Sequence, residues 1–180
     1  MAEKYLIASD IHGSALYCQK MLDAFEREDA EHMILLGDLL YHGPRNELPG
    51  GYDTKTVAQL LNPYKDKIYA VRGNCDAEVD QMVLEFPIQA DYMLLKSGHL
   101  MMFATHGHLY NESQLPAMDA VDVLLHGHTH VACCRRHEGY TYINPGSVSL
   151  PKEGTKRGYI LLEDGVFVWK DLDGNEYMRY

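Results

Sequence analysis

One short histidine-rich segment constrains this chain more than any other stretch. Residues 124–130 read Leu-Leu-His-Gly-His-Thr-His, so an apolar run passes through a glycine turn into two histidines one residue apart. Side chains at positions i and i+2 of extended backbone point the same way, so His128 and His130 are expected to reach one metal or two adjacent metals. A single His-x-His pair is more often an ordinary surface or core feature, and this interpretation therefore needs support from the rest of the chain.

Four other segments have the same pattern, in which an apolar run ends in Asp, Asn or His beside a glycine. In open α/β sheets, functional sites form beyond the carboxyl ends of the strands. Each segment alone also fits a helix N-cap, an ordinary turn or a hydrogen-bonded buried histidine, but chance would have to produce the pattern five times. The full set of candidate ligands is Asp10, His12, Asp38, Asn74, His106, His128 and His130.

The chain alternates strand and helix in its first part and is rich in strands in its last part. Strands are predicted over residues 4–9, 32–36, 67–72, 92–95, 100–104, 121–125, 131–137, 140–143, 158–162 and 166–169, and helices over 15–28, 54–62 and 76–84. This order predicts an α/β (α+β) fold in which two sheets pack face to face with helices outside. A length of 180 residues fits a single domain over residues 1–180.

The composition excludes several classes of function. A formal net charge of −10 argues against a broad nucleic-acid-binding surface. No apolar run is long enough for a membrane span, and the N-terminus lacks the features of a signal peptide. The four cysteines show no disulfide or zinc-ribbon spacing, which indicates free thiols in a reducing cytoplasm. Strands near the C-terminus leave pairing across a homo-oligomer open.

The ligand types indicate which metals fit. Imidazole with carboxylate and amide oxygens suits Mn, Fe, Co, Ni or Zn. Seven ligands are too many for one such ion, but they fit two ions about 3.5–4 Å apart that share a carboxylate. Asp38 is the expected bridge because it is the lone ligand of its segment. Two such ions leave a net positive charge that attracts a phosphate ester, and they make hydroxide available at neutral pH.

These motifs resemble those of the calcineurin-like metallophosphoesterases, in the same order. The matching segments are Asp10-x-His12, Gly37-Asp38, Gly73-Asn74, His106 and Gly127-His128-x-His130. A closer similarity is to bacterial YfcE-like phosphodiesterases, which share Ser-Asp-Ile-His-Gly, His-Gly-Pro-Arg-Asn, Arg-Gly-Asn-Cys-Asp, Thr-His-Gly-His and Asn-Pro-Gly-Ser. The resemblance implies a double β-sandwich with flanking helices and a dinuclear site, often supported by manganese.

The resemblance also implies how the ligands divide between the two ions. The first metal would be held by Asp10, His12, Asp38 and His130, and the second by Asp38, Asn74, His106 and His128. Asn74 is also expected to act on the substrate, both in binding and in catalysis. By the same family pattern, the position after Gly73-Asn74 often carries a histidine that acts as an acid or orients the substrate. Here that position is Cys75, so the metal set is complete while the usual acid is missing.

Three neighbouring residues are candidates for the remaining chemistry. The thiol of Cys75 is a weak donor and a poor substitute for imidazole. His108 either supplies a proton or hydrogen-bonds a ligand, and Asp76 either orients a ligand or caps a following helix, the cap being slightly favoured. Without a good acid, the enzyme should favour esters whose leaving group needs little help.

The long loop over residues 41–51 is rich in Gly and Pro and directly follows Asp38, so we expect it to form a wall of the site. Within it, Arg45 is either a clamp on a phosphate oxygen or simply solvated. The turn Asn144-Pro145-Gly146-Ser147 is expected to lie behind the site with a structural role only.

Together these features predict a metal-dependent phosphodiesterase with a dinuclear centre and a bridging hydroxide, acting on a small phosphodiester. The first alternative is a phosphomonoesterase, including a protein phosphatase, and the absence of histidine at Cys75 weighs against it. The second alternative is a binding scaffold that keeps the fold without catalysis. Such a scaffold should show eroded ligands, whereas all seven are present.

Overall fold

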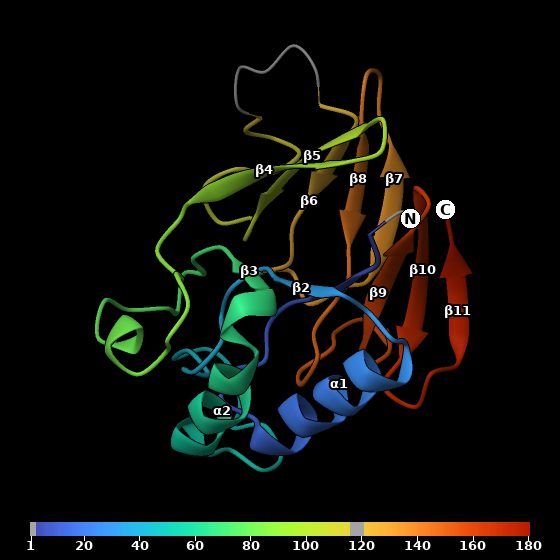
Figure 1. Cartoon of the computed structure of the whole chain (residues 1–180). Coiled ribbons are helices and arrows are strands. Elements are labelled where there is room, and N and C mark those ends of the chain that lie inside the picture. Colours follow the sequence, from blue (N-terminus) through green and yellow to red (C-terminus); the bar gives the residue numbers. More distant parts are fainter. Residues whose placement is uncertain (1–2, 116–120) are drawn as a thin grey trace.

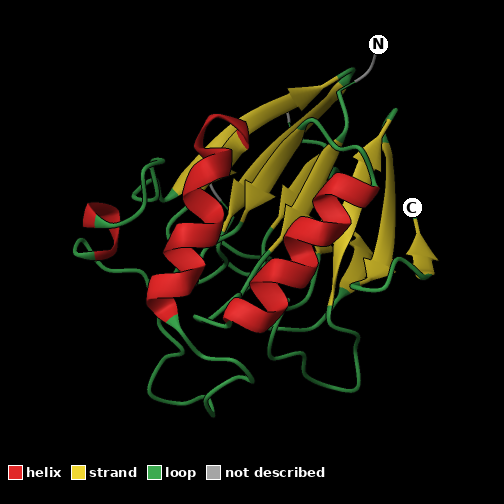
Figure 2. Ribbon diagram, turned by 60° about the horizontal axis from the view of Figure 1, so that its bottom comes forward, coloured by secondary structure: helices red, strands yellow, loops and turns green. Residues whose placement is uncertain are grey.

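Two β-sheets pack face to face, and two α-helices cover the outer face of one of them (Figure 1, Figure 2). The computed structural model describes residues 3–115 and 121–180. This is the predicted double-sheet architecture with flanking helices. None of the helices in the described ranges is long and apolar enough to cross a membrane.

The first sheet has six strands in the order β11-β10-β9-β1-β2-β3. Its parallel half consists of β1 (Tyr5–Ala8), β2 (His32–Leu35) and β3 (Ile68–Ala70). Its antiparallel half consists of β9 (Gly158–Glu163), β10 (Val166–Asp171) and β11 (Glu176–Arg179). All four residues of β1 are buried, as expected for a central strand covered on both faces.

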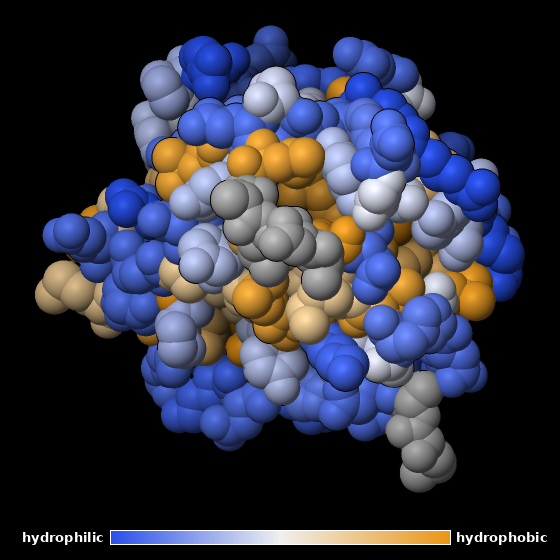
Figure 3. Space-filling view, turned by 90° about the horizontal axis from the view of Figure 1, so that it is seen from above, coloured by the Kyte–Doolittle hydropathy of each residue, from blue (hydrophilic) through white to orange (hydrophobic). Residues whose placement is uncertain are grey.

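The second sheet has five strands in the order β4-β5-β6-β8-β7. They are β4 (Tyr92–Ser97), β5 (Leu100–Thr105), β6 (Val123–Leu125), β7 (Cys133–Arg136) and β8 (Thr141–Asn144). Strands β5, β6 and β8 are parallel to one another. In the described residues no helix covers the outer face of this sheet, where Tyr92 and Leu94 are half exposed and apolar side chains gather (Figure 3).

The helices begin at side-chain caps. Helix α1 (Ala15–Arg27) follows Ser14, whose hydroxyl accepts a hydrogen bond from the Tyr17 amide at 3.2 Å. Helix α2 (Thr54–Leu61) follows Asp53, whose carboxylate accepts one from the Thr56 amide at 3.0 Å, and the 3₁₀ helix η1 (Asn62–Lys67) continues from it. One core lies between these helices and the first sheet, and a second lies between the two sheets.

The sequence predictions of secondary structure are confirmed with three exceptions. The helix predicted over 76–84 is wrong, because this segment contains only the short 3₁₀ helix η2 (Asp80–Met82). Its backbone is tied instead by side-chain hydrogen bonds, since Gln81 donates to the carbonyl oxygens of Leu84 and Phe86. Strand β11 was not predicted, and β8 joins β6 in parallel where only antiparallel pairing was expected.

Candidate metal centre

All seven predicted ligands lie together at the carboxyl ends of parallel strands. The first sheet contributes Asp10 and His12 after β1, Asp38 after β2 and Asn74 after β3. The second sheet contributes His106 directly after β5, and His128 and His130 after β6. Because the two sheets pack with these ends at the same side, segments more than 100 residues apart meet in one place, as the His12–His130 contact shows.

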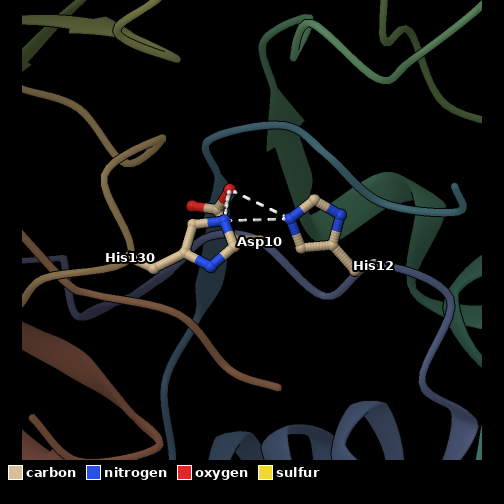
Figure 4. Close-up of side chains that lie close together, drawn as sticks. All are labelled: Asp10, His12 and His130. Carbon is tan, nitrogen blue, oxygen red and sulfur yellow. Dashed lines mark hydrogen bonds and ion pairs between the residues drawn. The ribbon is translucent and has the colours of Figure 1, made fainter. Parts of the chain in front are cut away.

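A first group of side chains converges on one carboxylate oxygen (Figure 4). Asp10 Oδ1 lies 3.3 Å from His130 Nε2 and 3.5 Å from His12 Nε2, and the two imidazole nitrogens are 3.1 Å apart. This oxygen is buried and makes no hydrogen bond. These three residues have ligand atoms close enough together to hold one metal ion.

A second group converges on His106. Its Nε2 lies 3.4 Å from Asp38 Oδ2, 3.1 Å from Asn74 Oδ1 and 3.1 Å from His128 Nδ1. The same Asp38 oxygen lies 3.7 Å from His12 Nε2, in the first group. Asp38 therefore faces both groups, and Asp10 of the first group also lies close to Asp38 and His106.

Three backbone carbonyls orient the imidazole rings. Nδ1 of His12 donates to Tyr41 O at 2.8 Å, Nδ1 of His106 to Leu36 O at 2.6 Å, and Nδ1 of His130 to Leu150 O at 2.7 Å. With Nδ1 donating to a carbonyl, Nε2 is the atom of each ring that faces the centre, and it can bind a metal ion once it is deprotonated. The donor set thus fits divalent metal ions.

The titration behaviour of the site reflects its two carboxylates. Burial disfavours the charged form of His106, but the hydrogen bond to Asp38 and the charges of Asp10 and Asp38 raise its pKa to about 9. Burial likewise disfavours the ionised form of Asp10, and the neighbouring imidazoles of His12 and His130 lower its pKa well below the usual range. The site therefore favours ionised carboxylates next to positive charge.

The backbone at the ligands is strained. Asp10, His12, Asp38, His128 and His130 all have positive φ, between 50° and 65°. The left-handed region is uncommon for residues other than glycine and costs of order 1 kcal/mol or more at each position. Five such residues in one site indicate that the fold holds these side chains in a conformation the chain does not prefer on its own.

The glycines beside the ligands are needed for close approach. A Cβ added at Gly73 would lie 2.1 Å from Asp38 Oδ1, and one at Gly127 would lie 1.9 Å from the Ser9 hydroxyl. Any side chain at these positions would collide with a ligand or its neighbour. The glycine that recurs in the sequence motif is thus explained by packing between strand ends of different segments.

Asp76 ties two ligand-bearing loops together. Its buried carboxylate accepts hydrogen bonds from the backbone amides of Asp38 and Leu39, both at 2.8 Å, and of Gly73 at 2.7 Å. Burial raises its pKa, and these amides partly offset that effect. The preferred prediction of a helix cap is wrong, since no helix begins here, and the alternative of orienting a ligand matches the contacts.

The turn Asn144-Pro145-Gly146-Ser147 has the structural role predicted for it, but its hydrogen bonds to the ligand loops were not predicted from the sequence. Asn144 Nδ2 donates to the carbonyl of Gly127 at 2.9 Å and to the Thr129 hydroxyl at 3.0 Å, so it fixes the turn that carries His128. Ser147 Oγ donates to the Asp10 carbonyl at 2.7 Å. The Asn-Pro-Gly-Ser turn was expected behind the site, and its hydrogen bonds reach the ligand loops directly.

Cys75 and His108 lie at the edges of the site. The Cys75 thiol lies close to His12 and Asp38, and burial together with the Asp38 charge raises its pKa to about 12. It is therefore protonated at neutral pH and a poor proton donor. The ring of His108 packs 5.4 Å from that of His106, its Nδ1 is buried without a partner, and burial lowers its pKa.

A cavity of about 1040 Å³ opens onto Asp38, Asn74, His128 and His130. The loop after Asp38 forms one wall through Tyr41, Gly43, Pro44, Arg45 and Asn46, as predicted. Three basic side chains also line it, from Arg45, Arg72 and Lys152. Three acidic side chains, from Asp38, Asp76 and Glu78, line the same cavity, so the protein charges balance there, and an excess of positive charge that would favour an anion depends on bound metal ions.

Comparison with known proteins points to one family. Residues 4–164 match the sequence description of the calcineurin-like phosphoesterase superfamily domain. The chain is 45% identical to phosphodiesterase YfcE of Escherichia coli K12 over 163 residues, covering 91% of this chain and 89% of that one. It is 31% identical to the probable metallophosphoesterase YsnB of Bacillus subtilis, covering 95% and 92%.

The fold is similar to that of solved structures. The structure of the phosphoesterase YfcE from E. coli superposes with a TM-score of 0.94 at 42% identity over 98% of each chain. Vacuolar Protein Sorting 29 from Cryptosporidium parvum superposes with a TM-score of 0.67 at 15% identity, covering 99% of this chain and 98% of that one. At that identity the likeness concerns the fold alone.

Proposed function

Because this chain belongs to the calcineurin-like phosphoesterase superfamily, we propose that it is a phosphodiesterase that acts through two divalent metal ions. One observation carries the proposal: seven donor side chains form two groups that Asp38 connects, with their donor atoms facing one another. The name of the 45% identical relative, a phosphodiesterase, supports the substrate class.

The ligands divide between the two ions by proximity. We assign Asp10, His12, Asp38 and His130 to the first, and Asp38, Asn74, His106 and His128 to the second. Two divalent ions bound there, with manganese the first choice, would make hydroxide available as a nucleophile at neutral pH and would polarise the phosphoryl group. Iron, cobalt, nickel and zinc suit the same donor set.

Residues of the cleft bind and position the substrate. Arg45 is exposed at the mouth of the cavity, and its guanidinium is suited to a phosphate oxygen. Asn74 faces the same cavity and positions the substrate in addition to its place beside His106. Asp76 acts on the reaction only through the loops of Asp38 and Gly73 that it holds.

Cys75, which follows Asn74, is a poor proton donor, so we expect the enzyme to prefer diesters with good leaving groups. A thiol whose pKa is raised to about 12 gives little proton to a leaving oxygen. His108 is the remaining candidate donor, but its ring packs beside His106 rather than among the residues that line the cavity. Monoesters and protein phosphates therefore rank below diesters as substrates.

The proposal extends to the setting of the enzyme. The whole chain, residues 1–180, acts as one domain, because each sheet supplies only part of the ligand set. All four cysteines are free, which suits the cytoplasm. A homo-oligomer through the strands near the C-terminus remains part of the proposal, and a broad nucleic-acid surface does not.

The test compares bis-p-nitrophenyl phosphate with p-nitrophenyl phosphate, each with and without added manganese. We expect diester cleavage that requires the metal and exceeds monoester cleavage. Preferred monoester cleavage would support a phosphatase. Bound metal without cleavage of either compound would support a binding scaffold and refute the proposal.

A further inference from the structure

A second cavity, of about 670 Å³, lies next to the metal cleft. Helix α2 forms one side, and the segment between β3 and β4, which carries η2 at the left of Figure 1, forms the other. Its apolar lining comes from Leu40, Tyr41, Tyr52, Ala58, Val79 and Val83. We call this cavity the apolar groove.

The apolar groove is continuous with the metal cleft. Tyr41, Cys75, Ala77 and Val79 line both cavities. The backbone amide of Cys75 also donates to Asp38 Oδ1 at 2.8 Å, so the shared wall begins at a candidate ligand. When a phosphoryl group lies at the candidate ligands, one of its ester groups can therefore extend into the groove.

The wall of the groove holds apolar side chains in solvent on a fixed backbone. Val79 is 62% exposed, Val83 is 50% exposed and Tyr41 is 43% exposed. Asn62 Nδ2 donates to the Val83 carbonyl at 2.9 Å, and the Glu85 amide donates to Asn62 Oδ1 at 2.9 Å. Exposed apolar side chains beside a functional cleft mark a surface for a ligand rather than a packing defect.

The two cavities differ in how many charged side chains line them. The metal cleft is lined by three basic and three acidic residues, namely Arg45, Arg72, Lys152, Asp38, Asp76 and Glu78. The groove has only one basic and one acidic residue, Lys55 and Asp80, and none of the charged residues of the cleft lines it. An uncharged group is thus favoured in the groove, whereas metal ions bound in the cleft would favour an anion there.

From this continuity, and resting on the phosphodiesterase function proposed above, we propose that the apolar groove binds one ester group of the substrate. The enzyme then selects diesters that carry a compact apolar group, a ring or a short alkyl chain, on one side of the phosphorus. Burial of that group against Val79, Val83 and Tyr41 supplies binding energy that the charged cleft does not.

The test uses phosphonates, whose carbon–phosphorus bond the enzyme does not hydrolyse. Methyl-, butyl-, hexyl- and phenylphosphonate are titrated as inhibitors of the manganese-loaded enzyme with bis-p-nitrophenyl phosphate as substrate. Each added methylene should lower the inhibition constant by roughly two- to fourfold while it enters the groove. Phenylphosphonate should bind tighter than methylphosphonate.

Variants locate the effect in the groove. Val83→Asp places a charge in the lining at a half-exposed position, and Val83→Thr keeps the side-chain shape while adding a hydroxyl. Met82→Asp is the matched control, because Met82 is the adjacent residue, is 82% exposed and does not line the groove. The dependence on chain length should be lost in Val83→Asp, reduced in Val83→Thr and kept in Met82→Asp.

Two outcomes would overturn the inference. Equal inhibition by all four phosphonates in the unmodified enzyme shows that the groove takes no ester group. If the dependence of inhibition on chain length is lost equally in Met82→Asp and Val83→Asp, the exposed segment is a surface for a partner and the groove is not the binding site. If bis-p-nitrophenyl phosphate is not cleaved, the proposed function fails, and calorimetric titration of the same phosphonates still decides whether the groove binds apolar groups.

Discussion

The two sheets supply different chemistry to the same centre. The first sheet contributes both carboxylates, Asp10 and Asp38, with Asn74 and one imidazole. The second contributes imidazoles only, from His106, His128 and His130. The negative charge that attracts metal ions thus comes from one sheet, and most of the neutral nitrogen donors come from the other.

The loops of the two sheets are also held by different means. Asp76, a buried carboxylate, accepts three backbone amides from the loops after β2 and β3. Asn144, a neutral amide, donates to the turn after β6. Hydrogen bonds to a charged group are stronger than neutral ones, so the ligands of the first sheet should be fixed more firmly. Five predictions test this difference between the sheets and the site they share.

Loss of the shared carboxylate should have the largest effect. Asp38→Ala should abolish diester hydrolysis, because Asp38 faces both ligand groups. Asp38→Asn is the companion variant, since asparagine tolerates the positive φ of 55° at this position. Turnover and metal content are measured together, and near-normal turnover in either variant would contradict the assignment.

The carboxylates of the first sheet should make metal affinity depend on pH, because they change the protonation of His106 in the second sheet. In the metal-free protein the pKa of His106 is raised to about 9, whereas a ligating imidazole must be neutral. Manganese must therefore displace one proton at pH 7, and its affinity should rise about tenfold per pH unit up to about pH 9. Calorimetric titrations at pH 7, 8 and 9 measure this, and a flat affinity would contradict it.

The same shift predicts the opposite trend for the stability of the metal-free protein. A histidine whose pKa is raised on folding stabilises the fold fully below its unfolded pKa of about 6.5. That contribution is lost as the pH rises through about 9, the value for folded His106. The melting temperature without metal should thus fall from pH 7 to pH 9, while manganese reverses the trend.

Variants that remove the hydrogen bonds of Asp76 or Asn144 should lower metal affinity to different extents, because the two residues support loops of different sheets. Asp76→Asn replaces an acceptor with an amide that cannot accept all three backbone hydrogen bonds, and it should lower metal affinity by about 10–100-fold. Asn144→Ala should lower it less, because the bonds lost are neutral. Asp164→Asn, at an exposed turn, is the control. A larger loss of metal affinity in Asn144→Ala than in Asp76→Asn would contradict the expectation that the ligands of the first sheet are fixed more firmly.

A histidine in place of Cys75 should give the smallest effect, and a gain rather than a loss. Cys75→His places a group that titrates near neutral pH where the thiol pKa is raised to about 12. Hydrolysis of esters with poor leaving groups should rise by about tenfold, which is less than the roughly 10²- to 10⁴-fold that a well-positioned general acid supplies. Unchanged or lower rates on every substrate would show that position 75 is not where the acid acts.

The sequence determined the candidate ligands and the architecture that carries them. Apolar runs ending in Asp10, Asp38 or His106 beside glycine mark buried strands with polar ends, and the carboxyl ends of parallel strands lie at one edge. Both features are local, so a periodic pattern read along the chain is enough to find them. The similarity to known phosphoesterases agrees with this interpretation.

Only the tertiary structure decided which groups meet and what supports them. Asp76 and Asn144 form hydrogen bonds to distant loops, and the apolar groove lies between α2 and η2. The spacing of these segments along the chain does not predict such contacts. The raised pKa values of His106 and Cys75 depend likewise on carboxylates brought close by folding. Long-range contacts and burial set these properties, because electrostatic effects depend on distance in space rather than on order in sequence.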